Sequence, residues 1–227
     1  MGLGGRIRRT VVSFMLKGIL GTLCKVDSRE LRKALSKNKP MLLAVNHINF
    51  LEVPLLVSYG YPRYVTGLAK SETWDNPFFA FLFNTYRAIP IDRGRAFGEA
   101  FRRAHEAVDN GFFVIVAPEG TRSKNGVLRQ GKAGIVQLAL EGDVPILPVA
   151  HYGGENIWKN IKRLRRTPFY IRAGRPFRIR FEGKPGREVR EEMVDEVMGQ
   201  MARLLPPGMR GVYAEQAERE CKYLDFL

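Results

Sequence analysis

The sequence predicts a single α/β domain in which a mixed, largely parallel sheet is covered by helices, preceded by an amphipathic helix that associates with a membrane. With 227 residues, 45% of them hydrophobic, the chain is long enough for one domain with a sizeable core. From residue 41 onward, short apolar runs alternate with runs of helical periodicity, as in a sheet with helices on both faces. Four of the apolar runs lack polar–apolar alternation, which indicates buried strands.

Residues 6–24 are predicted to form the N-terminal helix. One side repeats apolar residues at every fourth position, and the other side is polar and mostly basic. The apolar positions are Ile7, Val11, Met15, Ile19 and Leu23, and the polar positions are Arg6, Arg9, Thr10, Ser13 and Lys17. Because Lys17 would be costly at mid-bilayer, we expect the helix to lie in the membrane interface. The alternative is a helix packed on the protein's own core. We assign residues 1–30 to this segment and 31–227 to the main domain.

The main domain is predicted to alternate strands and helices along its length. Strands are predicted at residues 41–46, 64–68, 112–117, 146–150, 169–173 and 177–181. Helices are predicted at residues 97–108, 135–139 and 187–205, and Pro206 and Pro207 end the last of these. We expect the last twenty residues to form a charged tail, for which a helix is one option.

The charge balance indicates an anionic partner. Lys and Arg number 37 against 23 Asp and Glu, a formal charge of +14, so nucleic acid, an anionic membrane surface and a phosphorylated substrate are the candidates. The basic run at residues 159–166 lacks the interleaved aromatic residues of a single-strand binder, so we do not expect nucleic acid. The two cysteines lie near opposite ends, which argues against a disulfide framework and fits a reducing, cytoplasmic setting.

A histidine follows the first strand of the main domain, within Asn-His-Ile-Asn-Phe-Leu-Glu at residues 46–52. Open α/β sheets bind ligands at the carboxyl ends of their strands, and histidine is the natural base for a hydroxyl near neutral pH. Glu52 could fix the tautomer of His47 by accepting from its other ring nitrogen. Five residues is not a helical spacing, so His47 must lie in a turn and Glu52 in the helix that follows. Alone, such a pair is more often structural than catalytic.

Two further motifs carry side chains suited to phosphate. Pro-Glu-Gly-Thr-Arg-Ser at residues 118–123 follows a predicted strand and offers the hydroxyl of Thr121 and the guanidinium of Arg122. Lys132 adds a positive charge at a predicted helix start, which itself favours anions. Ile-Pro-Ile-Asp-Arg at residues 89–93 ends on Arg93, which could also bind phosphate. Seen alone, the motif at residues 118–123 is more typical of a polar turn, and Arg93 of a structural ion pair, than of a binding site.

Taken in chain order, the motifs at residues 46–52, 89–93 and 118–123, followed by Val-Pro-Ile-Leu-Pro-Val-Ala at residues 144–150, resemble the four blocks of the glycerolipid acyltransferase family. That family includes bacterial 1-acylglycerol-3-phosphate acyltransferases. The resemblance spans roughly residues 41–150, and the Pro-Glu-Gly-Thr-Arg-Ser block is its most specific part. Glu52 stands where the family usually has Asp, and Pro90 where it usually has Phe.

The resemblance implies that His47 is the catalytic base and Glu52 its orienting carboxylate. It implies acceptor binding, with the arginines on phosphate, by Arg93, Glu119, Gly120, Thr121 and Arg122; Lys132 joins them on the chemical grounds above. A thioester is already activated, so a deprotonated hydroxyl can attack it directly once both substrates are held together. No nucleophilic serine or cysteine, no metal and no bound cofactor are therefore expected.

The expected function is transfer of a fatty acyl group from a thioester of coenzyme A or acyl carrier protein to a lysophospholipid hydroxyl. The acceptor would be 1-acylglycerol-3-phosphate and the product phosphatidic acid, with residues 31–227 as the acyltransferase domain. The expected partners are the thioester donor, acyl carrier protein itself, the lysophospholipid and an anionic membrane surface. The expected place is the cytoplasmic face of a membrane, with the protein peripheral or monotopic.

Three alternatives stay open at this point. The acceptor could be an amino- or glycolipid without phosphate, since the family's blocks are shared by such enzymes. The chain could instead be a non-catalytic basic module that binds a membrane. The aromatic-rich stretch at residues 74–86 either fills the core, or lines a groove for the acyl chain or touches lipid.

Overall fold

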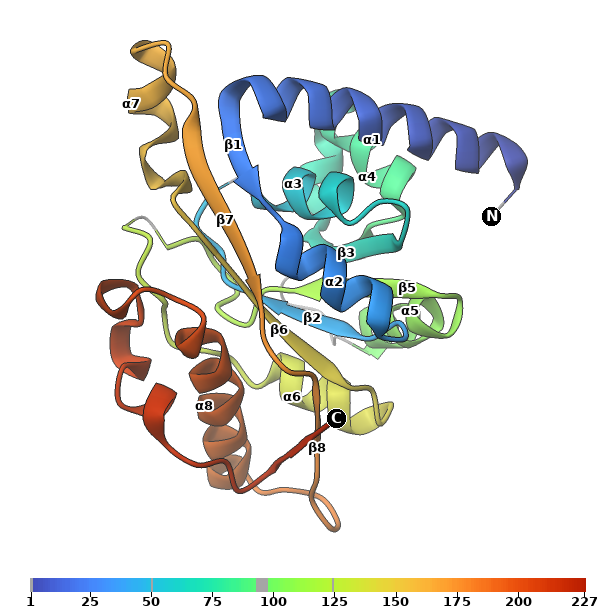
Figure 1. Ribbon diagram of the computed structural model, residues 1–227. Coiled ribbons are helices and arrows are strands. Elements are labelled where there is room, and N and C mark those ends of the chain that lie inside the picture. The colour runs from blue at the N-terminus through green and yellow to red at the C-terminus, as the bar shows by residue number, and fades with distance from the viewer. Residues whose placement is uncertain (1, 50, 93–97, 124) are drawn as a thin grey trace.

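The computed structural model describes residues 2–49, 51–92, 98–123 and 125–227 (Figure 1). Within these ranges nine strands form one sheet, in the order β1-β7-β6-β2-β5-β3-β4, with β8 pairing with β6 and β9 pairing with β8. The strands are β1 (Cys24–Asp27), β2 (Leu42–Val45), β3 (Tyr64–Lys70), β4 (Ile89–Ile91), β5 (Phe112–Val116), β6 (Ile146–Tyr152), β7 (Thr167–Ala173), β8 (Phe177–Ile179) and β9 (Leu224–Phe226). The helices are α1 (Leu3–Leu23), α2 (Arg29–Lys37), α3 (Glu52–Tyr59), α4 (Pro77–Tyr86), α5 (Gly98–Asp109), α6 (Gly134–Glu141), α7 (Ile157–Lys162) and α8 (Arg187–Arg203).

The two faces of the sheet are covered by different sets of helices. The connections β2–α3–β3 and β4–α5–β5 run in opposite directions along the sheet, so right-handed crossovers place their helices on opposite faces. Helices α1, α3 and α4 pack together on one side, and α6 and α8 pack on the other (Figure 1). Helix α5 joins the second layer, where the Nε2 atom of His105 lies 2.8 Å from the carbonyl oxygen of Leu138 in α6. The mixed sheet covered by helices is therefore confirmed.

The central strands all end at one edge of the sheet. Strand β2 runs parallel to both β5 and β6, and β3 runs parallel to β5 and β4, so these five strands share a direction. In β2 and β5 every residue is buried, as expected for strands covered on both faces. Because carboxyl ends of parallel strands meet at the same edge, the loops after β2, β5 and β4 are brought close together.

The ends of the chain differ from the sequence expectation. The last twenty residues, expected as a charged tail with a helix as one option, contain the short 3₁₀ helices Gly211–Tyr213 and Gln216–Glu218 and end in β9, which pairs antiparallel with β8; Ala217, Tyr223 and Leu224 are buried. At the other end, β1 pairs in parallel with β7 and so extends the main sheet. The predicted boundary at residue 30 falls within α2.

Helix α1 packs on the domain through two polar residues, Arg9 and Ser13, together with the apolar Val12 and Leu20. Arg9 is 1% exposed and donates from Nη2 to the carbonyl oxygen of Arg63 at 2.7 Å, and the hydroxyls of Ser13 and Tyr86 are 2.9 Å apart. The guanidinium of Arg9 lies 4.4 Å from the ring centre of Tyr64. Other large apolar residues of α1 are exposed; these are Leu3, Ile7, Val11, Phe14, Met15 and Ile19. No helix among the described residues has the length and apolar character needed to cross a membrane.

Candidate active site

His47 and Glu52 meet at the end of β2. His47 lies in the turn after the strand, and Glu52 is the first residue of α3, as the sequence predicted. Glu52 Oε1 contacts His47 Nδ1, while Glu52 Oε2 accepts from the backbone N–H groups of Ile48 and Asn49, both at 3.0 Å. The start of a helix also stabilises a carboxylate. The Glu52 side chain is 2% exposed and that of His47 is 25% exposed, so the carboxylate is buried while the ring reaches the surface.

Glu119 joins the loop after β5 to the backbone of His47. Its Oε1 accepts from the His47 N–H at 2.7 Å and its Oε2 from the Arg129 N–H at 2.9 Å. The carbonyl oxygen of His47 accepts from the Ser123 N–H at 2.6 Å. Glu119 is 2% exposed, and burial raises the pKa of its carboxyl. The motif at residues 118–123 is thus hydrogen-bonded to the motif at residues 46–52. Both carboxylate oxygens of Glu119 already accept from backbone N–H groups.

Thr121 and Arg122 of this loop turn their side chains outward, whereas Ser123 is buried. Gly120 has φ +65°, and a Cβ atom there would lie 3.1 Å from Lys132 Nζ, so the lysine side chain covers the glycine. The Lys132 N–H donates to the carbonyl oxygen of Pro118 at 2.9 Å. Thr121, Arg122 and Lys132 are exposed. A hydroxyl and two cations therefore lie on the solvent side of the loop that holds His47.

Arg93, the remaining predicted binding residue, lies outside the described residues. The motif that carries it forms β4, which pairs with β3 and ends at the same edge of the sheet as β2 and β5. Asp92 follows β4 and accepts from the hydroxyl of Ser71.

His151 is a site residue that the sequence analysis did not single out. It lies in β6 with 0% exposure, and its Nε2 is 2.7 Å from the carbonyl oxygen of Asn46 and 3.1 Å from Glu52 Oε2. The Asn46 side chain pairs with the backbone of His151, accepting from its N–H at 2.8 Å and donating to its carbonyl at 3.0 Å. Burial lowers the pKa of His151 to about 4. The available signal was its place directly after the fourth motif.

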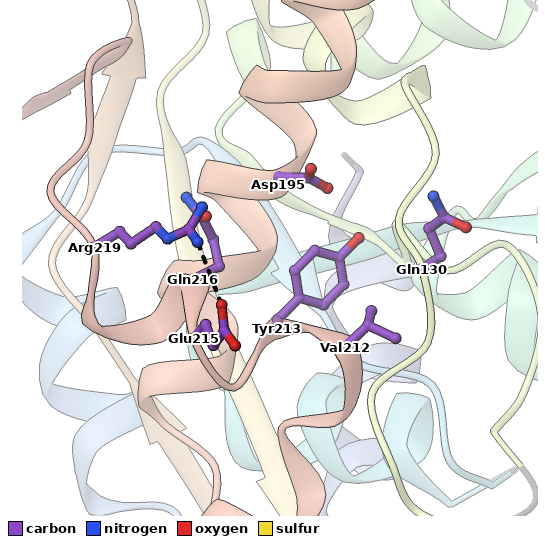
Figure 2. A pocket seen from close by; sticks show the side chains of 7 residues that line it. All are labelled: Gln130, Asp195, Val212, Tyr213, Glu215, Gln216 and Arg219. Carbon is purple, nitrogen blue, oxygen red and sulfur yellow. Dashed lines mark hydrogen bonds and ion pairs between the residues drawn. The ribbon is translucent and has the colours of Figure 1, made fainter.

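A pocket lies between α8, the C-terminal turns and Gln130, which follows the loop at residues 118–123 in the chain (Figure 2). It is lined by Gln130, Asp195, Val212, Tyr213, Glu215, Gln216 and Arg219, none of which is a predicted site residue. The hydroxyl of Tyr213 accepts from the Gly131 N–H at 2.8 Å, and burial raises the pKa of Tyr213 to about 12. Because Gly131 precedes Lys132, the C-terminal turns support the loop that carries the candidate binding residues.

The model of the acyltransferase family matches residues 25–152, more than half of the chain. The chain belongs to the acyltransferase family. It is 29% identical over 178 residues to a 1-acyl-sn-glycerol-3-phosphate acyltransferase of Cocos nucifera, a match covering 77% of this chain and 56% of that protein. It is 29% identical over 133 residues to a lyso-ornithine lipid O-acyltransferase of Pseudomonas aeruginosa, covering 58% of this chain and 50% of that protein. The chain thus spans about half the length of these curated relatives.

The fold of this family member is also that of a solved structure. The crystal structure of the 1-acyl-sn-glycerophosphate acyltransferase PlsC from Thermotoga maritima superposes with a TM-score of 0.62. The superposition covers 94% of this chain and 81% of that one, at 22% sequence identity. At that identity the likeness establishes the α/β fold alone.

Proposed function

We propose that this protein transfers a fatty acyl group from an acyl thioester to a hydroxyl of 1-acylglycerol-3-phosphate, giving phosphatidic acid. The observation that carries the proposal is the contact between His47 and Glu52 at the carboxyl edge of the sheet, fixed to the Pro-Glu-Gly-Thr-Arg-Ser loop through Glu119. Membership of the acyltransferase family and the names of the relatives support it. Both coenzyme A and acyl carrier protein are candidate carriers of the thioester.

The proposed step needs one base and no covalent enzyme intermediate. With Nδ1 of His47 on Glu52, Nε2 takes the proton of the acceptor hydroxyl. The hydroxyl oxygen forms a bond to the thioester carbonyl carbon, the carbon–sulfur bond breaks, and the leaving thiolate takes the proton back from His47. The Glu52 carboxylate stabilises the imidazolium that exists between these two transfers. Base catalysis of this kind contributes roughly 10²–10⁴-fold.

The acceptor's phosphate is assigned to the exposed polar side of the loop. Thr121, Arg122 and Lys132 supply the donors, with Arg93 as a fourth candidate. For Glu119 we propose a bracing role in place of acceptor contact, because its oxygens already accept from two backbone N–H groups. Arg122→Ala should raise KM for the phosphate-bearing acceptor about tenfold, since a charge-assisted hydrogen bond contributes about 1.5–3 kcal/mol.

The control for Arg122→Ala is Arg187→Ala, which removes an exposed arginine paired with Glu191 on α8. It should leave KM unchanged. An acceptor without phosphate supplies the second control. If Arg122→Ala impairs transfer to that acceptor equally, the assignment of Arg122 to phosphate is wrong.

A second candidate acceptor is an amino lipid without phosphate, and the similarity to a lyso-ornithine lipid O-acyltransferase supports it. Purified protein should be given acyl-coenzyme A and acyl carrier protein thioesters in turn, each with 1-acylglycerol-3-phosphate and with lyso-ornithine lipid. The proposal expects the highest kcat/KM on the phosphate acceptor. Preference for the amino lipid would select the second candidate, and no transfer with any pair would leave the non-catalytic membrane-binding module.

We also propose that α1 holds the enzyme on the cytoplasmic face of a membrane, as a peripheral or monotopic protein. The outward apolar side of α1 supports this, together with Phe78 and Phe81 of α4, which are 62% and 49% exposed. Near the end of α1, Arg166 donates to the carbonyl oxygen of Cys24 at 2.9 Å, and residues 162–166 are exposed and mostly basic. Such residues suit anionic headgroups.

Point substitutions test the membrane contact better than removal of α1, because Val12 and Leu20 belong to the core. Ile7→Ser combined with Val11→Ser should weaken co-sedimentation with vesicles of phosphatidylglycerol and phosphatidylcholine. Val212→Ser is the control, since this exposed valine (74%) lies in the C-terminal turns. Equal binding by all three proteins would show that α1 is not the membrane contact.

A further inference from the structure

The carboxylate of Glu52 extends between two histidines. One oxygen contacts Nδ1 of His47, and the other accepts from two backbone N–H groups and lies 3.1 Å from Nε2 of His151. The family usually has Asp at this position, and Glu carries one more methylene and one more rotatable bond. A longer side chain reaches further, and it also has more conformational freedom to lose when the carboxylate is held in one place.

The surroundings of His151 determine which ring nitrogen carries the proton. Nε2 faces two oxygen atoms, the carbonyl of Asn46 at 2.7 Å and Glu52 Oε2 at 3.1 Å. Nδ1 is buried and has no hydrogen-bond partner among the described residues. A bare lone pair on Nε2 would be repelled by both oxygens, so the neutral ring carries its proton on Nε2, donates it to the Asn46 carbonyl, and places the same polar N–H group 3.1 Å from Glu52 Oε2.

The ring has little freedom to turn away from this position. It stacks on Phe169 with centroids 5.3 Å apart and an interplanar angle of 12°. Its backbone is held from both sides by the amide of Asn46. Burial lowers its pKa to about 4, so the ring stays neutral near pH 7 and donates one hydrogen bond without adding a second positive charge beside Glu52.

We propose that His151 is a positioning residue: its Nε2–H group, held by the Asn46 carbonyl and 3.1 Å from Oε2, attracts the Glu52 carboxylate and keeps it against His47. The proposal rests on the acyl transfer proposed above. His151 is fully buried and so does not touch substrate; its effect reaches the reaction only through Glu52. This attraction restricts the last rotatable bonds of the Glu52 side chain, which otherwise leave its carboxylate several positions.

Three substitutions separate the donated hydrogen bond from mere packing. The amide nitrogen of Gln falls near the place of Nε2 and that of Asn near the place of Nδ1, while Leu fills space without a donor. We expect His151→Leu and His151→Asn to lower kcat about 10- to 100-fold with KM unchanged for both substrates, and His151→Gln to keep kcat within about threefold of the wild type. His105→Leu is the matched control, because it removes another Nε2 contact with a carbonyl oxygen, away from the site.

The proposal is overturned if folded His151→Leu keeps the wild-type kcat, or if Gln and Asn at position 151 lower kcat equally. Should the Leu variant fail to fold, the comparison of Gln with Asn decides. A double-mutant cycle adds a second criterion. Glu52→Asp withdraws the carboxylate from His151, so His151→Leu should cost less than about threefold in that background. An equal cost in both backgrounds would mean that His151 does not act through Glu52.

A measurement without turnover keeps this proposal separate from the function itself. The chain has three histidines, so ¹⁵N-histidine NMR at pH 7 is readily assigned by removing one at a time. We expect the Nε2–H tautomer for His151, and a change in its Nε2 signals on Glu52→Gln. The Nδ1–H tautomer, or no response to Glu52→Gln, would overturn the contact. If the wild type transferred no acyl group in any assay, the proposed function would fail while these spectra still tested the pairing.

Discussion

Glu52 at the edge of the sheet and Arg9 in α1 are 2% and 1% exposed, yet their charges are accommodated in different ways. Glu52 contacts two histidine rings and accepts from two backbone N–H groups. Arg9 makes one hydrogen bond, and its Nε and Nη1 have no hydrogen-bond partner among the described residues. Its guanidinium lies instead 4.4, 5.7 and 5.8 Å from the ring centres of Tyr64, Tyr86 and Phe112.

Glu52 and Arg9 are held differently because their roles differ: the carboxylate of Glu52 must be oriented for the reaction, whereas Arg9 only attaches α1 to the domain. Hydrogen bonds are directional, so the donors around Glu52 fix both the position and the orientation of its carboxylate. Attraction between a cation and aromatic rings depends less on direction and still favours a buried guanidinium. We therefore expect small changes around Glu52 to affect the rate of transfer, and changes at Arg9 to affect stability.

The largest effect is expected at the group that Glu52 orients. His47→Ala should reduce transfer by orders of magnitude, because the acceptor hydroxyl would lose its base. The fold should persist, since the backbone bonds of His47 to Glu119 and Ser123 do not involve its ring. Thermal unfolding and kcat of the purified variant check both statements. Near-normal turnover in a folded variant would remove His47 from the mechanism.

Glu52 itself should be the next most sensitive position. Glu52→Gln keeps the size and removes the charge that stabilises the imidazolium, so much of the activity should be lost. Glu52→Asp keeps the charge but withdraws the carboxylate, and misplacement by about 1 Å can cost about 10²-fold. We expect Asp to be worse here than Glu, although Asp is usual in the family. Kinetics of both variants decide: wild-type rates with Gln would make Glu52 structural, and an Asp variant at least as fast as the wild type would remove the need for the longer side chain.

Features that depend on neighbouring residues could be predicted from the sequence, and contacts between distant residues could not. Strands β2, β5 and β6 could be predicted because each is a short apolar run in the sequence. The pairing of His47 with Glu52 could also be predicted, because the two residues are only five positions apart. The His151–Glu52 contact joins residues about a hundred positions apart, and nothing local in an apolar strand marks the histidine as a donor. Strands β1 and β4 were missed because one contains Lys25 and the other Pro90, which weaken the pattern of a strand.

The periodicity of α1 predicted two faces correctly but could not tell which one meets the protein. An amphipathic helix on a soluble domain ordinarily turns its apolar side inward. Here the rings of three distant segments form a site for the guanidinium of Arg9, so Arg9 is buried and the apolar stripe of Ile7, Val11, Met15 and Ile19 is left outward. Only the folded arrangement of β3, α4 and β5 makes that orientation favourable.

Arg9 should affect stability more than transfer. Arg9→Ala removes the ring contacts and the hydrogen bond to Arg63, and should lower the free energy of unfolding by about 2 kcal/mol. Arg9→Met keeps apolar volume and removes Nε and Nη1, which have no hydrogen-bond partner among the described residues. It should therefore lower the free energy of unfolding by less than about 1 kcal/mol. Urea unfolding of both variants tests this. A loss with Met as large as the loss with Ala would show that the charge, and not the packing, holds α1.

The smallest effect concerns the pH dependence of stability through His151. Its pKa is about 4 in the folded protein and 6.5 as the ordinary value, so the unfolded chain binds a proton between these pH values that the folded protein rejects. Protonation then favours unfolding, and stability from this group is full above about pH 6.5 and falls as the pH drops toward 4. At pH 5.5 the loss relative to pH 7.5 should be about 1.4 kcal/mol.

The pH effect is measured as a difference between the wild type and His151→Gln, because other groups titrate in the same range. Glu119, whose pKa is raised by burial, is present in both proteins, so its contribution largely cancels. Urea unfolding at pH 7.5 and 5.5 should show that the variant loses less stability than the wild type. Equal losses would mean that His151 is not buried as a neutral ring. A greater loss in the variant would mean that the ring is protonated in the folded protein, where it would stabilise Glu52 as an ion pair and not as a neutral donor.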